Sequence, residues 1–321
     1  MNIWKFISNH LNENRRVILL IVIESNGSSP GRLGFKMAIA DNYQILGSIG
    51  GGIMEHAMVE YAKKLFVEKS FRPFAKKQVH NTESKKHQSG MICSGEQTIL
   101  FYQIKPIVDD IAIMSKVIQC VKDNCKSILS FSPHGMKFGS ALKLEQHFKS
   151  DIKNENVWEY HEKISFKNEL YIIGGGHVGQ ALSQTMVQLG FYVTVFDDRP
   201  MLNTMEMNSF AHKKLVVDYG EIGNYIPEGE NIYVVIMTFK HVSDKDILHR
   251  LLKKRCKYIG LMGSKSKVEK IFAESEKLGF TGEDLSRVHS PIGISIKSET
   301  PEEIAISIAA EIILIKNKKT S

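Results

Sequence analysis

The sequence lacks a long run of apolar residues. The longest such stretch near its start, residues 17–23, is far shorter than the roughly 20 residues that a transmembrane helix needs. The first residues also lack the apolar core and the small-residue cleavage site of a signal peptide. We therefore expect a cytoplasmic protein with no membrane partner.

Cysteine is scarce as well. The four cysteines are Cys93, Cys120, Cys125 and Cys256, and no two of them form a C-x-x-C pair. This spacing argues against a disulfide framework and against a zinc site, and it suits a reducing compartment. Cys120 and Cys125 flank the end of a predicted helix over residues 108–121, so we interpret both as structural residues.

Nor does the sequence contain the interleaved aromatic and basic residues of a nucleic-acid stacking platform. The chain is basic, with a net charge of +7 and a pI near 9.0. Its lysines, however, are spread over many predicted helices and the C-terminal segment 316–319. This distribution favours a solvated basic surface, so we expect no nucleic-acid partner. An anionic small ligand or an acidic protein partner also fits.

What the sequence does contain is enough apolar residues for two domain cores. Of its 321 residues, 43% are hydrophobic and 24% are charged, which is typical of globular proteins. In the first half, residues 140–156 show no clear pattern. In the rest of the first half, the sequence predicts strands at 16–24, 35–40, 43–46, 71–80, 97–104, 126–131 and 156–164, and helices at 4–14, 53–66 and 108–121.

The clearest motif lies between Asn168 and Arg199. An apolar strand over 170–173 precedes Gly-Gly-Gly-His-Val-Gly, and a helical pattern then leads to a second strand over 191–196. This order is typical of a Rossmann unit, whose glycines permit a tight turn, the approach of a pyrophosphate and close helix packing. Free N–H groups at the helix start favour an anion. The candidate ligand-binding residues here are Gly174, Gly176, His177, Gly179, Asp197 and Asp198.

The two acids follow the glycines by about 20 residues, where a carboxylate accepts a hydrogen bond from a ribose hydroxyl. Asp197 and Asp198 would repel a 2′-phosphate, so NAD or another unphosphorylated ribose is favoured over NADP. We expect an α/β fold with an N-terminal α/β domain over 1–165. The C-terminal domain, over 166–321, is predicted to be a Rossmann-type, doubly wound parallel sheet.

A second glycine-rich stretch covers residues 47–56 and leads into a predicted helix. Three consecutive glycines cost conformational entropy, and a nest of N–H groups for a phosphate or other oxyanion would explain them. The alternative is a tight strand-to-helix turn, in which Glu55 is a favourable first-turn residue. The candidate ligand-binding residues are Gly47, Ser48, Gly50, Gly51, Gly52 and Glu55.

In the C-terminal half, three residues lie where predicted parallel strands end, which is where ligands bind in such sheets. His241 follows the strand over 232–238, and Gly263 and Ser264 follow the strand over 258–262. His241 could face a pocket, or it could begin a helix that Ser243 caps. The lysines after Ser264 make an anion contact plausible. Farther on, Thr300 and Glu303 predict a capping box.

Cys93 lies between glycines, outside any periodic core pattern. An accessible thiol there could be a soft metal ligand or a sulfur acceptor. A lone cysteine is, however, usually a small buried hydrophobic residue, and composition alone favours that interpretation.

Taken together, these motifs resemble the XdhC/CoxI family of accessory factors for molybdenum hydroxylases such as xanthine dehydrogenase. The resemblance covers both halves of the chain in the family's order. It rests on GSSP at 27–30, GSIGGG-x-x-E at 47–55, Cys93-x-Gly95, GGGHVGQAL with FDDR, MT-x-x-H-x-x-D at 237–244, YIGLMGS-x-x-K at 258–267, PIG at 291–293 and TPEEIAISIAAEI at 300–312.

The resemblance implies a chaperone that binds the molybdenum cofactor, in its molybdopterin form. Such a factor protects the cofactor, supports its sulfuration with a cysteine desulfurase, and passes it to the hydroxylase apoenzyme. By the same resemblance Cys93 becomes the candidate contact to the molybdenum centre. A homodimer is expected, and the Rossmann half is free to bind NAD or another nucleotide.

Two alternatives remain open at this point. One is an NAD-dependent oxidoreductase, in which His177 or His241 performs acid–base chemistry; the other is a purely structural assembly protein. Any dehydrogenase needs a tuned acid or base in its substrate pocket, whereas the N-terminal half offers glycine turns and one thiol. The chain also lacks the cysteine array of iron–sulfur clusters. We therefore expect a cofactor-handling factor and not a free-standing enzyme.

Overall fold

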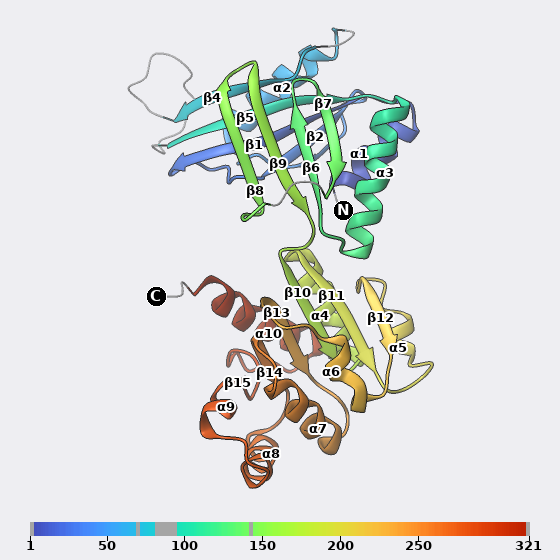
Figure 1. Cartoon of the computed structure of the whole chain (residues 1–321), viewed down its shortest axis with the longest axis vertical. Coiled ribbons are helices and arrows are strands. Elements are labelled where there is room, and N and C mark those ends of the chain that lie inside the picture. Colours follow the sequence, from blue (N-terminus) through green and yellow to red (C-terminus); the bar gives the residue numbers. More distant parts are fainter. Residues whose placement is uncertain (1–2, 69–70, 81–94, 141–143, 319–321) are drawn as a thin grey trace. The chain divides into compact units, whose positions relative to one another are not determined.

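The computed structural model describes residues 3–68, 71–80, 95–140 and 144–318. The chain divides into two compact units, Met1–Ser165 and Phe166–Ser321, here called unit 1 and unit 2 (Figure 1). Unit 1 contains antiparallel sheets, and unit 2 contains a parallel sheet of six strands. The predicted α/β fold class, with a Rossmann-type C-terminal part, is confirmed.

The larger sheet of unit 1 has the strand order β3-β2-β1-β5-β4, so β1 and β5 lie in its interior. Residues 17–23 of β1 are buried because both faces of the sheet are covered. Helix α2 (Gly52–Leu65) packs on one face, where Met54 and Val59 contribute to the core. The strands are β1 (Val17–Gly27), β2 (Lys36–Ala40), β3 (Ile45–Gly47), β4 (Phe74–His80) and β5 (Gly95–Ile104).

A second, four-stranded sheet and two helices cover the other face. Helices α1 (Ile3–Asn12) and α3 (Val108–Asp123) lie side by side (Figure 1). Two of the four strands, β7 and β8, were not predicted, because they are short and mostly polar or partly exposed. The sheet has the order β7-β6-β9-β8, with β6 (Ser127–Ser132), β7 (Gly135–Gly139), β8 (Phe148–Asn154) and β9 (Val157–Ile164).

An ion pair inside unit 1 joins β2 to β9. Lys36 Nζ lies 2.6 Å from Glu162 Oε2, and the two side chains are only 13% and 3% exposed. The Tyr160 hydroxyl donates a hydrogen bond of 3.0 Å to the same carboxylate. The Lys36 ammonium group also lies 5.7 Å from the ring centre of Trp4 and 5.3 Å from that of Phe148. This pair therefore links the two sheets across a largely apolar interior.

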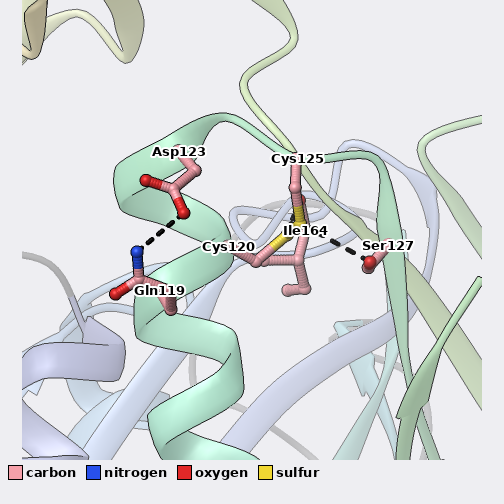
Figure 2. Close-up of a disulfide and its surroundings, with 6 residues drawn as sticks. All are labelled: Gln119, Cys120, Asp123, Cys125, Ser127 and Ile164. Carbon is pink, nitrogen blue, oxygen red and sulfur yellow. Dashed lines mark hydrogen bonds between the residues drawn. A yellow bond between two sulfur atoms is a disulfide. The ribbon is translucent and has the colours of Figure 1, made fainter.

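The expectation that the cysteines form no disulfide is wrong for one pair. Cys120, in the last turn of α3, is joined to Cys125, as Figure 2 shows. The helix ends at Asp123, its C-cap Asn124 has a left-handed backbone, and this turn brings the two Cα atoms within 4.9 Å. Because a helix end and its cap separate the two cysteines, their spacing in the sequence did not suggest a pair.

The sheet of unit 2 is parallel throughout, with the order β12-β11-β10-β13-β14-β15. Strands β11 and β12 follow β10 on one side of it, and β13, β14 and β15 follow on the other side. The strand order therefore reverses between β10 and β13, and this is the topological switch point of the sheet. The strands are β10 (Asn168–Ile173), β11 (Phe191–Asp197), β12 (Lys213–Val216), β13 (Gly229–Ile236), β14 (Cys256–Leu261) and β15 (Val288–His289).

Helices cover both faces of this sheet, as expected for a doubly wound fold. Helices α4 and α10 pack together on one face, and α6, α7 and α8 contribute to the core on the other. The predicted capping box of Thr300 and Glu303 is confirmed at the start of α10. The helices are α4 (His177–Gln188), α5 (Asn203–Glu206), α6 (Ile222–Tyr225), α7 (His241–Leu252), α8 (Lys265–Lys277), α9 (Gly282–Ser286) and α10 (Pro301–Asn317), with a 3-10 turn at Tyr219–Glu221.

In the part of the chain that the structure describes, no helix combines the length and the apolar character that crossing a membrane requires.

Candidate functional site

The glycine turn of unit 2 follows β10 and opens α4. Gly174 has a φ of +122°, and a Cβ added to it would lie 2.4 Å from the carbonyl oxygen of Met237. A Cβ on Gly179 would lie 2.3 Å from the carbonyl oxygen of Gly174. The first of these glycines is therefore required by the tight turn, and the last by close packing of helix on strand.

Gly176 differs from its two neighbours in the motif. A Cβ added to it would meet no atom within 4 Å, so no contact inside the protein requires a glycine there. Gly176 is the N-cap of α4, and no side chain caps this helix end. His177, the first residue of α4, is exposed. Backbone N–H groups at an uncapped helix start, with space before them, suit a phosphate.

Alanine substitutions at the two ends of this turn should have different effects. Gly174→Ala should lower the free energy of unfolding by at least about 2 kcal/mol, because it adds backbone strain to a steric clash. Gly176→Ala should change it by less than about 0.5 kcal/mol, because the added methyl group meets nothing. Urea unfolding followed by circular dichroism compares the two. Equal losses of stability would show that Gly176 is needed for folding.

Asp197 does not have the free carboxylate that the sequence led us to expect. Its side chain is fully buried and accepts hydrogen bonds from the Gly175 N–H, at 2.7 Å, and from Arg199. Burial opposes the charge of Asp197, but the bonds from Arg199 and Gly175 outweigh burial, so the pKa of Asp197 is lowered. Asp198, the next residue, is exposed. Arg199 is the functional candidate that sequence reasoning missed.

A second buried carboxylate organises the ends of β13 and β14. Asp244 is fully buried, and its Oδ1 accepts hydrogen bonds from the N–H of Thr238, at 3.0 Å, and from the Thr238 hydroxyl, at 2.6 Å. Its Oδ2 lies 2.5 Å from Lys267 Nζ, which also donates to the carbonyl oxygen of Met262. The lysine expected to meet an anionic ligand therefore neutralises an acid of its own chain.

The remaining predicted residues of unit 2 have local roles. Ser264 is the N-cap of α8, and its hydroxyl accepts a hydrogen bond from the N–H of Lys267. A Cβ on Gly263 would lie 2.8 Å from the Lys267 side chain. His241 is the first residue of α7, as one of the two alternatives had it, but the N-cap is Lys240 and not Ser243. Its Nε2 is buried and forms no hydrogen bond among the described residues.

Backbone hydrogen bonds bring these loops to one edge of the sheet. The N–H of Gly174 donates to the carbonyl oxygen of Phe196, and that of Met237 donates to Ile173. The N–H of Met262 in turn donates to Ile236. The loops that follow β10, β11, β13 and β14 are therefore neighbours, and the glycine turn lies at the switch point, where parallel sheets bind ligands.

In unit 1 the glycine-rich turn over 47–52 is occupied by a side chain. Glu55 Oε2 accepts hydrogen bonds from the Ser48 hydroxyl at 2.6 Å, the Ile49 N–H at 2.9 Å and the Gly51 N–H at 3.0 Å. Burial opposes the charge of Glu55, but these bonds outweigh burial, so the pKa of Glu55 is lowered. The expected nest of N–H groups exists, but its anion is Glu55.

The loop over 27–32 contacts both this turn and Gly95, the first residue of β5. An added Cβ on Gly50 would lie 2.7 Å from the Gly31 nitrogen, and one on Gly95 would lie 2.6 Å from the Ser29 nitrogen. Gln97, which sequence reasoning missed because it lies within a strand, holds the loop over 27–32 in place. Its Oε1 accepts hydrogen bonds from the Ser29 hydroxyl, at 2.7 Å, and from the Gly31 N–H, at 3.2 Å.

The predicted metal ligand Cys93 lies outside the described residues. Within them, no group of three or more histidine, cysteine, aspartate or glutamate side chains could hold a metal ion. Of the cysteines that the structure describes, Cys256 is the one with a thiol, and burial raises its pKa to about 11. This thiol is therefore a poor nucleophile at neutral pH.

Curated relatives match the chain over one or both of its units. It is 24% identical over 318 residues to the uncharacterized protein YqeB of Escherichia coli, which covers 99% of this chain and 47% of that protein. Over 157 residues it is 27% identical to a Bacillus subtilis protein that is named as a probable subunit of xanthine dehydrogenase, covering 49% of this chain and 46% of the other. The chain thus spans about half the length of these relatives.

A solved structure and two family profiles complete the comparison. A crystal structure from Bacillus halodurans, described as a xanthine dehydrogenase, is 23% identical and has a TM-score of 0.70, covering 100% of this chain and 97% of its own. The two proteins therefore share a fold. The XdhC and CoxI family matches residues 10–74, and the XdhC Rossmann domain matches residues 170–312. The chain belongs to the XdhC and CoxI family, with an XdhC Rossmann domain as its C-terminal part.

Proposed function

We propose that the chain is an accessory factor that handles the molybdenum cofactor for a hydroxylase of the xanthine dehydrogenase type. Family membership supports this proposal, as does the name of the Bacillus subtilis relative. In the proposal the chain binds the molybdopterin form of the cofactor, supports its sulfuration by a cysteine desulfurase, and passes it to the hydroxylase apoenzyme.

The observation that carries the proposal is the meeting of two loops and the first residue of β5, Gly95, at one end of the larger sheet of unit 1. The two loops contain two of the sequence motifs that resemble the family, residues 27–30 and residues 47–55, and Gly95 is the last residue of a third motif. Gly95 follows Cys93 by two residues in the sequence and packs against Ser29. Cys93 is the residue that we propose contacts the molybdenum centre.

Of the two glycine turns, the turn in unit 2 is the one that fits the phosphate group of a ligand. The turn in unit 1 does not, because the N–H groups of Ile49 and Gly51 already bind Glu55. In unit 2, Gly176 faces open space at an uncapped helix start. The residues proposed to hold the phosphate are therefore Gly176 and His177, through backbone N–H groups that orient it without proton transfer.

Metal and pterin content test the proposal directly. The full chain is purified from a host that makes the molybdenum cofactor, and molybdenum and pterin are measured for the wild type, Cys93→Ala and Cys256→Ala. We expect both to accompany the wild type and the Cys256→Ala control, and to fall to a minor fraction in Cys93→Ala. A wild type that retains NAD but neither molybdenum nor pterin would contradict the proposal and favour the NAD-dependent oxidoreductase.

A further inference from the structure

In a Rossmann fold, the residue at the end of the strand that corresponds to β11 ordinarily binds the ribose of a nucleotide. An aspartate or glutamate at this place accepts a hydrogen bond from the ribose 2′-hydroxyl. To do so it must offer the ligand at least one unoccupied lone pair. A carboxylate has about four such positions on its two oxygens.

All four positions on Asp197 are filled by its own chain. Oδ1 accepts from the Arg199 N–H at 3.0 Å and from Arg199 Nε at 2.8 Å. Oδ2 accepts from the Gly175 N–H at 2.7 Å and from Arg199 Nη2 at 2.9 Å. The carboxylate is also fully buried, so a hydroxyl group cannot reach it from solvent. Asp197 thus shapes the glycine turn instead of facing a ligand.

Arg199 covers this carboxylate. Its side chain is 47% exposed and supplies two of the four hydrogen bonds through a forked, two-point contact. Such a contact is strong and geometrically specific. Any ligand that approaches the end of β11 therefore meets a guanidinium group that already neutralises the acid beneath it, together with the exposed side chain of Asp198.

We infer that Arg199 is a specificity-determining residue. Because it occupies the Asp197 carboxylate, the ligand site of unit 2 does not prefer ligands that carry a ribose diol. The inference rests on the proposed ligand site at the glycine turn. The ligand class is a phosphate ester that is held through its phosphate, whether or not a nucleoside is attached. A pterin phosphate belongs to this class, and a nucleotide has no advantage over it at the end of β11.

The test compares ADP with 2′-deoxy-ADP, which differ only in the ribose 2′-hydroxyl. Calorimetric titration of the full wild-type chain should give dissociation constants within about twofold of each other, because the Asp197 carboxylate has no position left to accept the hydroxyl. Arg199→Ala removes two of the four bonds and uncovers the carboxylate. This variant should bind ADP about tenfold more tightly than 2′-deoxy-ADP, the effect of one hydrogen bond to a charged acceptor.

Three further variants make the outcome decisive. Arg255→Ala changes an exposed arginine next to the start of β14, at the opposite edge of the sheet, and should leave the ratio unchanged. Arg199→Lys keeps a charge without the forked contact, and serves if Arg199→Ala does not fold by circular dichroism. A wild type that prefers ADP tenfold overturns the inference, especially if Asp198→Ala abolishes that preference.

Absence of binding is also informative. If the wild type binds neither nucleotide, the inference requires Arg199→Ala or Arg199→Lys to acquire measurable affinity for ADP. Variants that remain without affinity, or that bind both nucleotides equally, overturn it. The proposed function fails on a different measurement, the molybdenum and pterin content of the wild type, so the two failures are distinguishable.

Discussion

Replacing Glu162 by alanine is expected to lower the free energy of unfolding of unit 1 by about 3–5 kcal/mol. The reason is that the variant leaves the Lys36 ammonium group in a largely apolar interior without its counter-charge, with the carbonyl oxygen of Gly34 as a remaining acceptor. The lost hydrogen bond from the Tyr160 hydroxyl adds to the effect. A charge that is buried and unpaired is far more costly than the loss of an exposed ion pair.

Tryptophan fluorescence measures this effect on unit 1 alone. The sequence contains two tryptophans, Trp4 and Trp158, and both are buried in the core of unit 1. The control is Glu60→Ala, which breaks the exposed ion pair with Lys63 and should have a far smaller effect. A double replacement, Lys36→Met with Glu162→Leu, should recover most of the stability, because it removes both charges. A Glu162→Ala variant no less stable than Glu60→Ala would contradict the prediction.

Asp244→Ala is expected to have an effect of similar size on unit 2, about 3–5 kcal/mol. Two groups lose the carboxylate at once: the Lys267 ammonium group, which keeps the carbonyl oxygen of Met262, and the backbone N–H of Thr238. Both lie where β13 and β14 end, so the loops beside the glycine turn should loosen first. Asp244→Asn keeps an acceptor for Thr238 but loses the charge, and should fall between the wild type and Asp244→Ala.

Far-UV circular dichroism combined with tryptophan fluorescence distinguishes the unfolding of unit 2 from that of unit 1. Unit 2 contains no tryptophan, so its unfolding changes ellipticity without a change in tryptophan emission. We expect Asp244→Ala to move the ellipticity transition to lower urea while the fluorescence transition stays in place. Glu274→Ala, which breaks the surface ion pair with Lys245, is the matched control. An unchanged ellipticity transition would show that the Asp244 network contributes little to stability.

The elements that could be predicted are those whose own residues carry a strong sequence pattern, and the elements that could not are those that depend on distant partners. The strand over 170–173, the glycine turn and the strand over 191–196 follow each other closely, and each has a strong signal of its own. Strands β7 and β8 do not, because their partners β6 and β9 supply most of the buried side chains. The disulfide was missed because its geometry depends on a left-handed turn at Asn124.

For the candidate site, the sequence predicted residue types but not their hydrogen bonds. Asp197 and Glu55 occur where a ligand-binding acid or a phosphate-binding turn is expected, yet each is bound to its own chain. In the sequence, an aspartate that binds a ribose and one that binds a neighbouring arginine are the same residue type, at a similar distance from the glycine motif. Only the positions of the Gly175 N–H and the Arg199 guanidinium group distinguish them.

The carboxylate in the turn of unit 1 has a further consequence for competing anions. Glu55 is tethered four residues from Gly51, so its effective concentration at the N–H groups is at least roughly millimolar. An external phosphate must exceed this internal competitor, and it must also displace the hydrogen bond from the Ser48 hydroxyl. Free phosphate or sulfate well below this concentration will therefore leave Glu55 bound to the turn.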